Sequence, residues 1–227
     1  MAALSGMRFW LDLLQIIGIN ILLSGDNAVV IALASRSLLE SQRRIAVIGG
    51  SAAAVVLRIL LSLIIASLLT VAYLKLIGGL LLIYIGIKLV IAEESAGTEV
   101  AARSNLWGAI QTILVADAVM SLDNVVAIAA AAHGSTLLIA LGLLISIPLI
   151  VFGSQLLLSV LNRFPVLVVL GAGLLGWIAG EIIVSDPATL TYFPYDEHTL
   201  ARIAKPVTAV VVMAGGLLLS KRPAKSS

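Results

Sequence analysis

The residues of this sequence that could do chemistry lie inside long apolar stretches, where they form two copies of a Ser-x-Asp-Asn motif. The first copy contains Ser24, Asp26 and Asn27, and the second, 97 positions later, contains Ser121, Asp123 and Asn124. An ionisable side chain in the hydrocarbon interior of a membrane costs roughly 2.5 to 3.5 kcal/mol on insertion scales, so such residues are usually functional. The same charged group in two copies of one context therefore predicts a binding site.

Helical spacing adds one more polar residue to each copy. Positions i, i+4 and i+7 share one face of a helix, and two such sets occur here, namely Asn20, Ser24 and Asn27, then Asp117, Ser121 and Asn124. Asp26 and Asp123 lie about 100° away from the neighbouring asparagines, so an unbroken helix would not aim both groups at one point. Gly25 would permit a local break in the first copy, whereas Leu122 occupies that position in the second.

We expect the two copies to build one cation site in the middle of a membrane. Its predicted ligands are carboxylate, amide and hydroxyl oxygens, from Asp26, Asp117, Asp123, Asn20, Asn27, Asn124, Ser24 and Ser121. Oxygen ligands suit Mg²⁺, Ca²⁺ and Mn²⁺, whereas Zn²⁺ and copper ions prefer imidazole and thiolate. The Met120 thioether would favour a transition metal if it faced the site, but packing between helices is the favoured interpretation.

Arg58 is expected near the middle of the second membrane span. It could be a counter-charge that occupies the carboxylates without a bound ion and is displaced when one binds. It could equally form a static ion pair or face a wet vestibule.

Composition indicates the class of protein. The chain is 61% hydrophobic and only 11% charged, with a mean hydropathy of +1.16, whereas soluble domains are about 25% charged. The absence of cysteine excludes a disulfide framework, a thiol nucleophile and a thiolate metal site. The net charge of +2 gives no indication of nucleic-acid binding, since the basic residues lie in loops. The sequence predicts a polytopic membrane protein that is not an enzyme and has no resident cofactor, with the lipid bilayer and a divalent metal ion as its partners.

The predicted fold is all-α, a single membrane domain over residues 1–227. Seven stretches are long enough to span a bilayer, at residues 10–34, 45–69, 71–92, 106–132, 136–161, 165–184 and 203–220. The motif copies divide them into two three-helix repeats, about 10–92 and 106–184, and an extra helix at about 203–220. Three spans is an odd number, so the second repeat must be inverted in the membrane, as in many secondary transporters.

Orientation follows from the basic residues. One predicted side carries nine Lys and Arg residues and the other carries four, with Arg58 left out. The positive-inside bias then places the N-terminus outside and the C-terminus inside. The outer segment 185–202 is predicted to be a loop, either a lid or an ordinary aromatic belt. The sequence does not determine the oligomeric state, and a homo-oligomer is one of the options.

The motif resembles that of a known family. Residues 23–32, Leu-Ser-Gly-Asp-Asn-Ala-Val-Val-Ile-Ala, together with residues 117–126, Asp-Ala-Val-Met-Ser-Leu-Asp-Asn-Val-Val, are similar to the TerC family of membrane proteins. The resemblance implies an efflux protein for divalent metal, chiefly manganese, in a bacterial cytoplasmic membrane, akin to the lysine-exporter superfamily. Family members often carry glutamate where this sequence has Asn20, which lowers the charge of the first half of the site.

Two other functions are open at this point. Two membrane aspartates on different helices could share a proton and form an intramembrane aspartyl hydrolase, although a water-activating pair does not require the Asn that follows each Asp. A metal-loading scaffold for secreted enzymes would share the cation site but needs no net transport.

Overall fold

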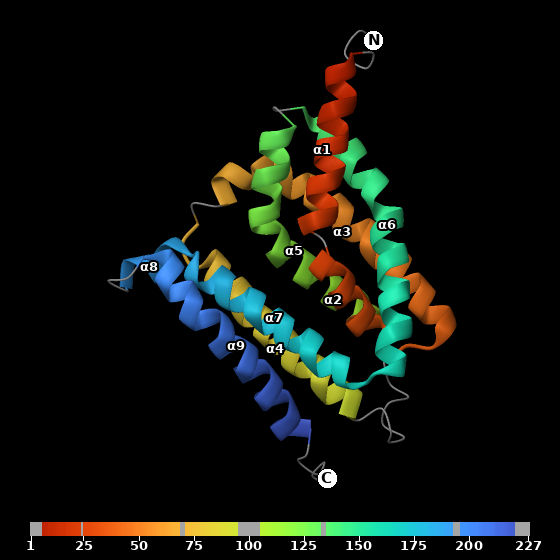
Figure 1. Cartoon of the computed structure of the whole chain (residues 1–227), viewed down its shortest axis with the longest axis vertical. Helices are drawn as coiled ribbons and strands as arrows, with labels where there is room; N and C mark the ends of the chain where they lie inside the picture. The colour runs from red at the N-terminus through yellow and green to blue at the C-terminus, as the bar shows by residue number, and fades with distance from the viewer. Residues whose placement is uncertain are drawn as a thin grey trace.

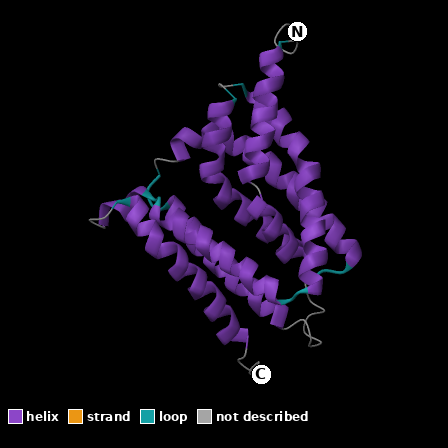
Figure 2. Cartoon of the chain, viewed as in Figure 1, coloured by secondary structure: helices purple, strands orange, loops and turns teal. Residues whose placement is uncertain are grey.

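All regular elements that the structure describes are α-helices, as the sequence predicts. The computed structural model describes residues 6–23, 25–68, 71–94, 105–132, 135–192 and 196–220 (Figures 1 and 2). The helices are α1 (Met7–Leu23), α2 (Gly25–Ser35), α3 (Glu40–Leu68), α4 (Leu74–Glu94), α5 (Leu106–Ala131), α6 (Thr136–Arg163), α7 (Val166–Val184), α8 (Pro187–Tyr192) and α9 (Glu197–Ser220).

Five of these helices are long and apolar enough to cross a membrane, among the residues described. They are α3, α4, α6, α7 and α9, and the bent pair α1–α2 would make a sixth span. The remaining predicted span corresponds to α5, in which the apolar stretch found among the described residues, Leu106–Leu122, is shorter than a span. The multi-pass membrane fold is therefore confirmed, whereas the count of seven spans stays a prediction.

The two motif copies differ in backbone. In the first copy, the stretches Phe9–Ile21 and Asp26–Ser35 are bent by 51° relative to each other. In the second copy, α5 continues as one helix through Asp123 and Asn124. The bend falls where Gly25 offers flexibility and is absent where Leu122 replaces it. It also places Asp26 in the first turn of α2.

Helices α4, α7 and α9 lie side by side and form one layer of the molecule (Figure 1). Glycines allow the close approach: a Cβ at Gly176 of α7 would lie 2.6 Å from the carbonyl oxygen of Thr208 and 2.8 Å from Cα of Ala209 on α9. Small residues let membrane helices approach closely and gain van der Waals contact.

The outer segment 185–202 was predicted to be a loop, and this is wrong for most of it. Residues 187–192 form α8, and α9 begins at Glu197, not at 203. Asp196 explains the earlier start, because its carboxylate accepts hydrogen bonds from the backbone N–H of Thr199 at 3.0 Å and from Thr199 Oγ1 at 2.7 Å. A side chain that accepts from the third residue of a helix is an N-cap. Residues 193–195 lie outside the described part.

Asp186, just beyond the α7 span, ties this segment to the start of α4. Its buried carboxylate accepts hydrogen bonds from the backbone N–H groups of Tyr73 at 3.1 Å, Lys75 at 3.0 Å, Leu76 at 3.2 Å and Ala188 at 2.8 Å. Burial alone would raise the pKa of Asp186, but the four N–H donors more than offset it and hold the pKa below its ordinary value. The carboxylate therefore caps α4 from the far end of α7.

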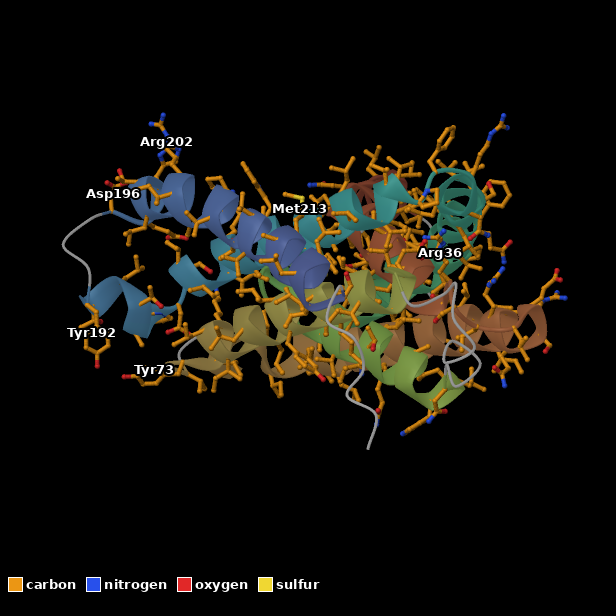
Figure 3. The ribbon with its side chains drawn as sticks, turned by 90° about the horizontal axis from the view of Figure 1, so that it is seen from below. Arg36, Tyr73, Tyr192, Asp196, Arg202 and Met213 are labelled. Carbon is orange, nitrogen blue, oxygen red and sulfur yellow. The ribbon has the colours of Figure 1, made fainter. Side chains whose placement is uncertain are left out.

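The two ends of the helix layer are held differently. At the Tyr73 end, Asp186 caps α4 and the Tyr73 and Tyr192 hydroxyls lie 3.3 Å apart. At the Arg36 end, Arg36 pairs with Glu93 at 2.5 Å and donates from Nε to Asn162 Oδ1 at 3.1 Å. Figure 3 shows the tyrosines near each other and Arg36 well away from them. Side-chain contacts with backbone at one end and with other side chains at the other thus tie both ends of the layer to neighbouring segments.

Replacing Gly176 with alanine should loosen the α7–α9 contact. The new methyl group meets backbone atoms that cannot move aside, and overpacking of this kind costs about 1 to 3 kcal/mol. We expect a fall of several degrees in the thermal unfolding midpoint in detergent, followed by circular dichroism. The matched control is Gly49→Ala on α3, where a Cβ would meet nothing within 4 Å. Equal midpoints for the two variants would contradict the packing role.

Replacing Asp186 with asparagine should lower stability at neutral pH and change its dependence on acid. A carboxylate whose pKa is depressed in the folded state contributes stability above its ordinary pKa, and this is lost as the pH falls through the lowered value. The wild type should therefore be more stable than Asp186→Asn at pH 7, by about 0.5 to 2 kcal/mol for a lost cap. The two unfolding midpoints should converge below about pH 4. A gap that stays constant down to pH 3 would exclude the ionised carboxylate as its cause.

Candidate functional site

A buried arginine lies at the centre of the polar residues that the sequence singles out. Arg58 of α3 is only 2% exposed, and its guanidinium forms an ion pair with the carboxylate of Asp117 on α5. From Nη1 it also donates a hydrogen bond to Asn20 Oδ1 on α1 at 2.7 Å. Arg58 therefore contacts two of the predicted site residues at once, on two helices other than its own.

Asp117 collects the other members of the cluster. Its Oδ1 accepts from Asn27 Nδ2 on α2 at 3.0 Å, and its Oδ2 accepts from Ser121 Oγ, one turn further along α5, at 3.2 Å. We refer to the five residues as the Arg58 cluster, which comprises Asn20, Asn27, Arg58, Asp117 and Ser121. All five are buried, and together they join α1, α2, α3 and α5 at one point.

The balance of charge makes this cluster tolerable in an apolar surrounding. Arg58 and Asp117 cancel each other, and the neighbouring amide and hydroxyl groups satisfy part of the remaining hydrogen-bonding capacity. Removing one partner from a buried pair leaves an uncompensated charge and costs about 3 to 5 kcal/mol. This pairing is common to the displaceable counter-charge and the static ion pair considered from sequence, so the choice between these two roles of Arg58 stays a prediction.

Asp26 is placed differently from Asp117. Its side chain is partly exposed, and its Oδ1 accepts the backbone N–H of Asn27 at 2.9 Å, at the start of α2. A carboxylate in the first turn of a helix is favoured by the helix dipole. Asp26 borders the Arg58 cluster through its hydrogen bond with Asn27, since Asn27 is a member of the cluster.

The remaining predicted ligands are only partly described. Asn124 lies half-buried on α5. Ser24 lies outside the described residues, and so does the side chain of Asp123, whose backbone belongs to α5. Among the side chains that are described, no three Asp, Glu, His or Cys groups come together as metal ligands. The convergence of Asp26 and Asp123 on one ion therefore stays a prediction.

Met120 packs in the core. It is 4% exposed and lies in an apolar cluster with residues that include Val30, Leu82 and Leu175. This supports the packing interpretation that the sequence favours.

A small cavity adjoins the Arg58 cluster. Its volume is about 20 Å³, its lining is mostly apolar, and its polar lining residues are Asn27, Ser51, Arg58 and Asp117. Sequence reasoning missed Ser51, which is buried on α3. A signal was present: Ser51 precedes Arg58 by seven residues, so the two side chains share one face of their helix.

This arrangement suits a cation. The guanidinium of Arg58 contacts the carboxylate of Asp117 on α5 and the amide oxygen of Asn20 on α1. Oxygens of these types are also ligands for hard divalent ions.

Comparison with known proteins agrees with this architecture. The family model of the integral membrane protein TerC family matches residues 5–226. The uncharacterized membrane protein YjbE of Bacillus subtilis is 40% identical over 209 residues, which cover 92% of this chain and 95% of that protein. The uncharacterized membrane protein YkoY of the same organism is 26% identical over 205 residues, covering 82% of this chain and 63% of that protein. No solved structure shows a significant match.

A double-mutant cycle should expose the coupling between Arg58 and Asp117. We expect Arg58→Gln and Asp117→Asn each to destabilise the protein by about 3 to 5 kcal/mol, because each leaves one buried charge without its partner. The double variant contains no unpaired charge, so it should be clearly more stable than the additive sum of the two single effects. The measurement is thermal or chemical unfolding in detergent. Strict additivity would mean that the two groups are not coupled in the folded protein.

Proposed function

The chain belongs to the TerC family of integral membrane proteins, and from that premise we propose that it is a secondary transporter that exports a divalent metal cation, chiefly Mn²⁺. The observation that carries the proposal is the buried Arg58–Asp117 pair inside a ring of amide and hydroxyl groups. A charged group within a membrane span marks an ion or substrate pathway by default. Here the guanidinium of Arg58 would be a cation that is part of the pathway itself.

Arg58 would act as the counter-charge of the empty state. An unpaired carboxylate in a membrane interior is costly. When the transporter changes conformation without a bound ion, a positive side chain beside the carboxylate removes this cost. An arriving divalent ion would take the oxygens of Asp117 and its neighbours, and Arg58 would move away. Asp26 and Asp123 would supply the further negative charge that a divalent ion requires.

The way the helices pair supports alternating access. If the chain is two inverted repeats, over about 10–92 and 106–184, then α1 corresponds to α5 and α3 corresponds to α6. Helix α1 packs on α6, and α5 packs on α3; this symmetry would exchange these two contacts. Helix α4 packs on its counterpart α7. Transporters with inverted repeats move ions by rocking such halves about a midplane site. We place the Arg36 end in the cytoplasm of a bacterial cell, because the basic residues gather there.

The choice of manganese rests on the ligands and on the family. The atoms of the Arg58 cluster that could ligate a metal ion are oxygens, which hard ions prefer, and Met120 packs in the apolar core. The two other functions make different demands. An aspartyl hydrolase needs two carboxylates that share a proton, whereas Asp117 is paired with an arginine. A metal-loading scaffold would bind the metal ion without carrying it across the membrane, so only a measurement of metal flux separates it from a transporter.

Reconstitution into liposomes provides the test. We expect the purified chain to carry Mn²⁺ across the membrane well above the rate of empty liposomes. Asp117→Asn and Asp26→Asn should each lower the flux at least about tenfold, the usual minimum loss for disturbing a metal site. The control is Ser154→Ala on α6, a buried serine that hydrogen-bonds only within its own helix. Saturable Mn²⁺ binding with no flux would support the scaffold, and flux unchanged in both aspartate variants would refute the proposed site.

A further inference from the structure

The cavity beside Arg58 lies on one side of the ion pair. Its walls come from α2, α3, α5 and α6. On α3 it reaches Ser51 and on α5 it reaches Ile113, and both residues are displaced from Arg58 and Asp117 towards the start of their helices. Both helices start at the Arg36 end of the molecule (Figure 1). The cavity therefore occupies the first space that an ion arriving from the Arg36 end would reach before Asp117.

Ser51 differs from the other buried serines. The hydroxyls of Ser35, Ser146 and Ser154 donate to backbone carbonyls of their own helices, at 2.7 to 2.8 Å, which is the usual behaviour of serine inside a helix. Ser51 is only 4% exposed, yet its Oγ has no hydrogen-bond partner in the described part of the chain. Leaving such a group unsatisfied costs about 1 to 3 kcal/mol.

Asn27 contributes a second oxygen of this kind. Its Oδ1 is buried without a hydrogen-bond partner among the described residues, and Asn27 lines the same cavity. Rotating the amide by 180° would not help, because Nδ2 is needed to donate to Asp117 Oδ1. Two buried oxygen atoms without a hydrogen-bond partner therefore belong to residues that line one cavity.

We propose that this cavity is a seat for the transported cation and that Ser51 is one of its ligands, together with Asn27 Oδ1 and Asp117. The inference rests on the transport function proposed above and adds a residue outside both motif copies. Two neutral oxygens unused by the fold, beside the carboxylate that Arg58 covers, are the ligands a small hard cation needs. The ion would compete with Arg58 for Asp117.

The size of the cavity restricts the cargo. A space of about 20 Å³ holds one water-sized particle, since a single water needs about 10 to 15 Å³ by this measure. A bare metal ion fits, whereas a fully hydrated ion or an organic ammonium group does not. The seat would therefore select an inorganic cation that sheds most of its water as it binds.

Replacing Ser51 with cysteine tests the direct contact. The chain has no cysteine, so any thiolate signal reports the introduced side chain alone. A thiolate is a soft ligand that favours Cd²⁺ over Mn²⁺. We expect Ser51→Cys to show the ultraviolet charge-transfer band of a cadmium–thiolate bond in detergent, reversed by excess Mn²⁺, and a Cd²⁺-to-Mn²⁺ flux ratio raised at least tenfold. Ser154→Cys is the matched control and should show neither change.

Replacing Ser51 with alanine supplies an independent readout. If the hydroxyl is unused by the fold, removing it should leave stability unchanged or slightly raised, while Mn²⁺ binding weakens about tenfold. A marked loss of stability would instead assign Ser51 a structural role and overturn the proposal. It would also be overturned if Ser51→Cys matched Ser154→Cys in both spectrum and selectivity, the result expected if the cavity holds only water.

These outcomes stay separate from those of the transport proposal. A cadmium–thiolate band that Mn²⁺ reverses, found in a protein without flux, would keep the seat and refute transport. Wild-type Mn²⁺ flux with no effect at Ser51 would keep transport and refute the seat.

Discussion

The ion pair between Arg58 and Asp117 is the interaction on which the centre of the molecule depends. It brings two charges to a depth where neither could remain alone, and the neighbouring polar groups come from the four helices that meet there. Hydrophobic packing cannot align these helices uniquely, because lipid tails are as apolar as the side chains that face them. A directional polar contact provides the missing specificity. The same contact carries the charge that a transported cation would have to replace, so architecture and proposed function depend on one pair of residues.

The contacts at the two ends of the helix layer differ in kind. At the Tyr73 end, the buried carboxylate of Asp186 accepts hydrogen bonds from backbone N–H groups at the start of α4. At the Arg36 end, side chains at the ends of α2, α4 and α6 meet through Arg36. The Arg36 and Glu93 side chains are only 13% and 19% exposed, so solvent and salt screen this pair less than a surface ion pair.

Much of this site could be predicted from spacing within single helices. The stripes that contain Asn20 and Asn27, and Asp117 and Ser121, do meet, because residues on one helical face can share one neighbour. The sequence could not show that Arg58 pairs with Asp117, since that contact depends on how α3 packs on α5. Ser51 was missed because its property is the lack of a hydrogen bond, which only coordinates reveal. The start of α9 was misplaced because Asp196 and Thr199 outweigh the polar character of that segment.

The asymmetry between the two motif copies follows from the same electrostatics. Among the described side chains, Arg58 pairs with the carboxylate of Asp117 and receives an amide oxygen from Asn20, where a carboxylate would add a second charge. A divalent ion that displaced Arg58 from Asp117 alone would leave an excess positive charge, so further carboxylates must take part. The bend at Gly25 places Asp26 at the border of the cluster, where its charge is held by the N-terminus of α2. In a continuous helix, the Asp26 side chain would point about 100° away from Asn27 around the helix axis, and so away from the residues that Asn27 contacts. The break in one copy, absent in the other, thus gives the two aspartates of a repeated motif different backbone settings.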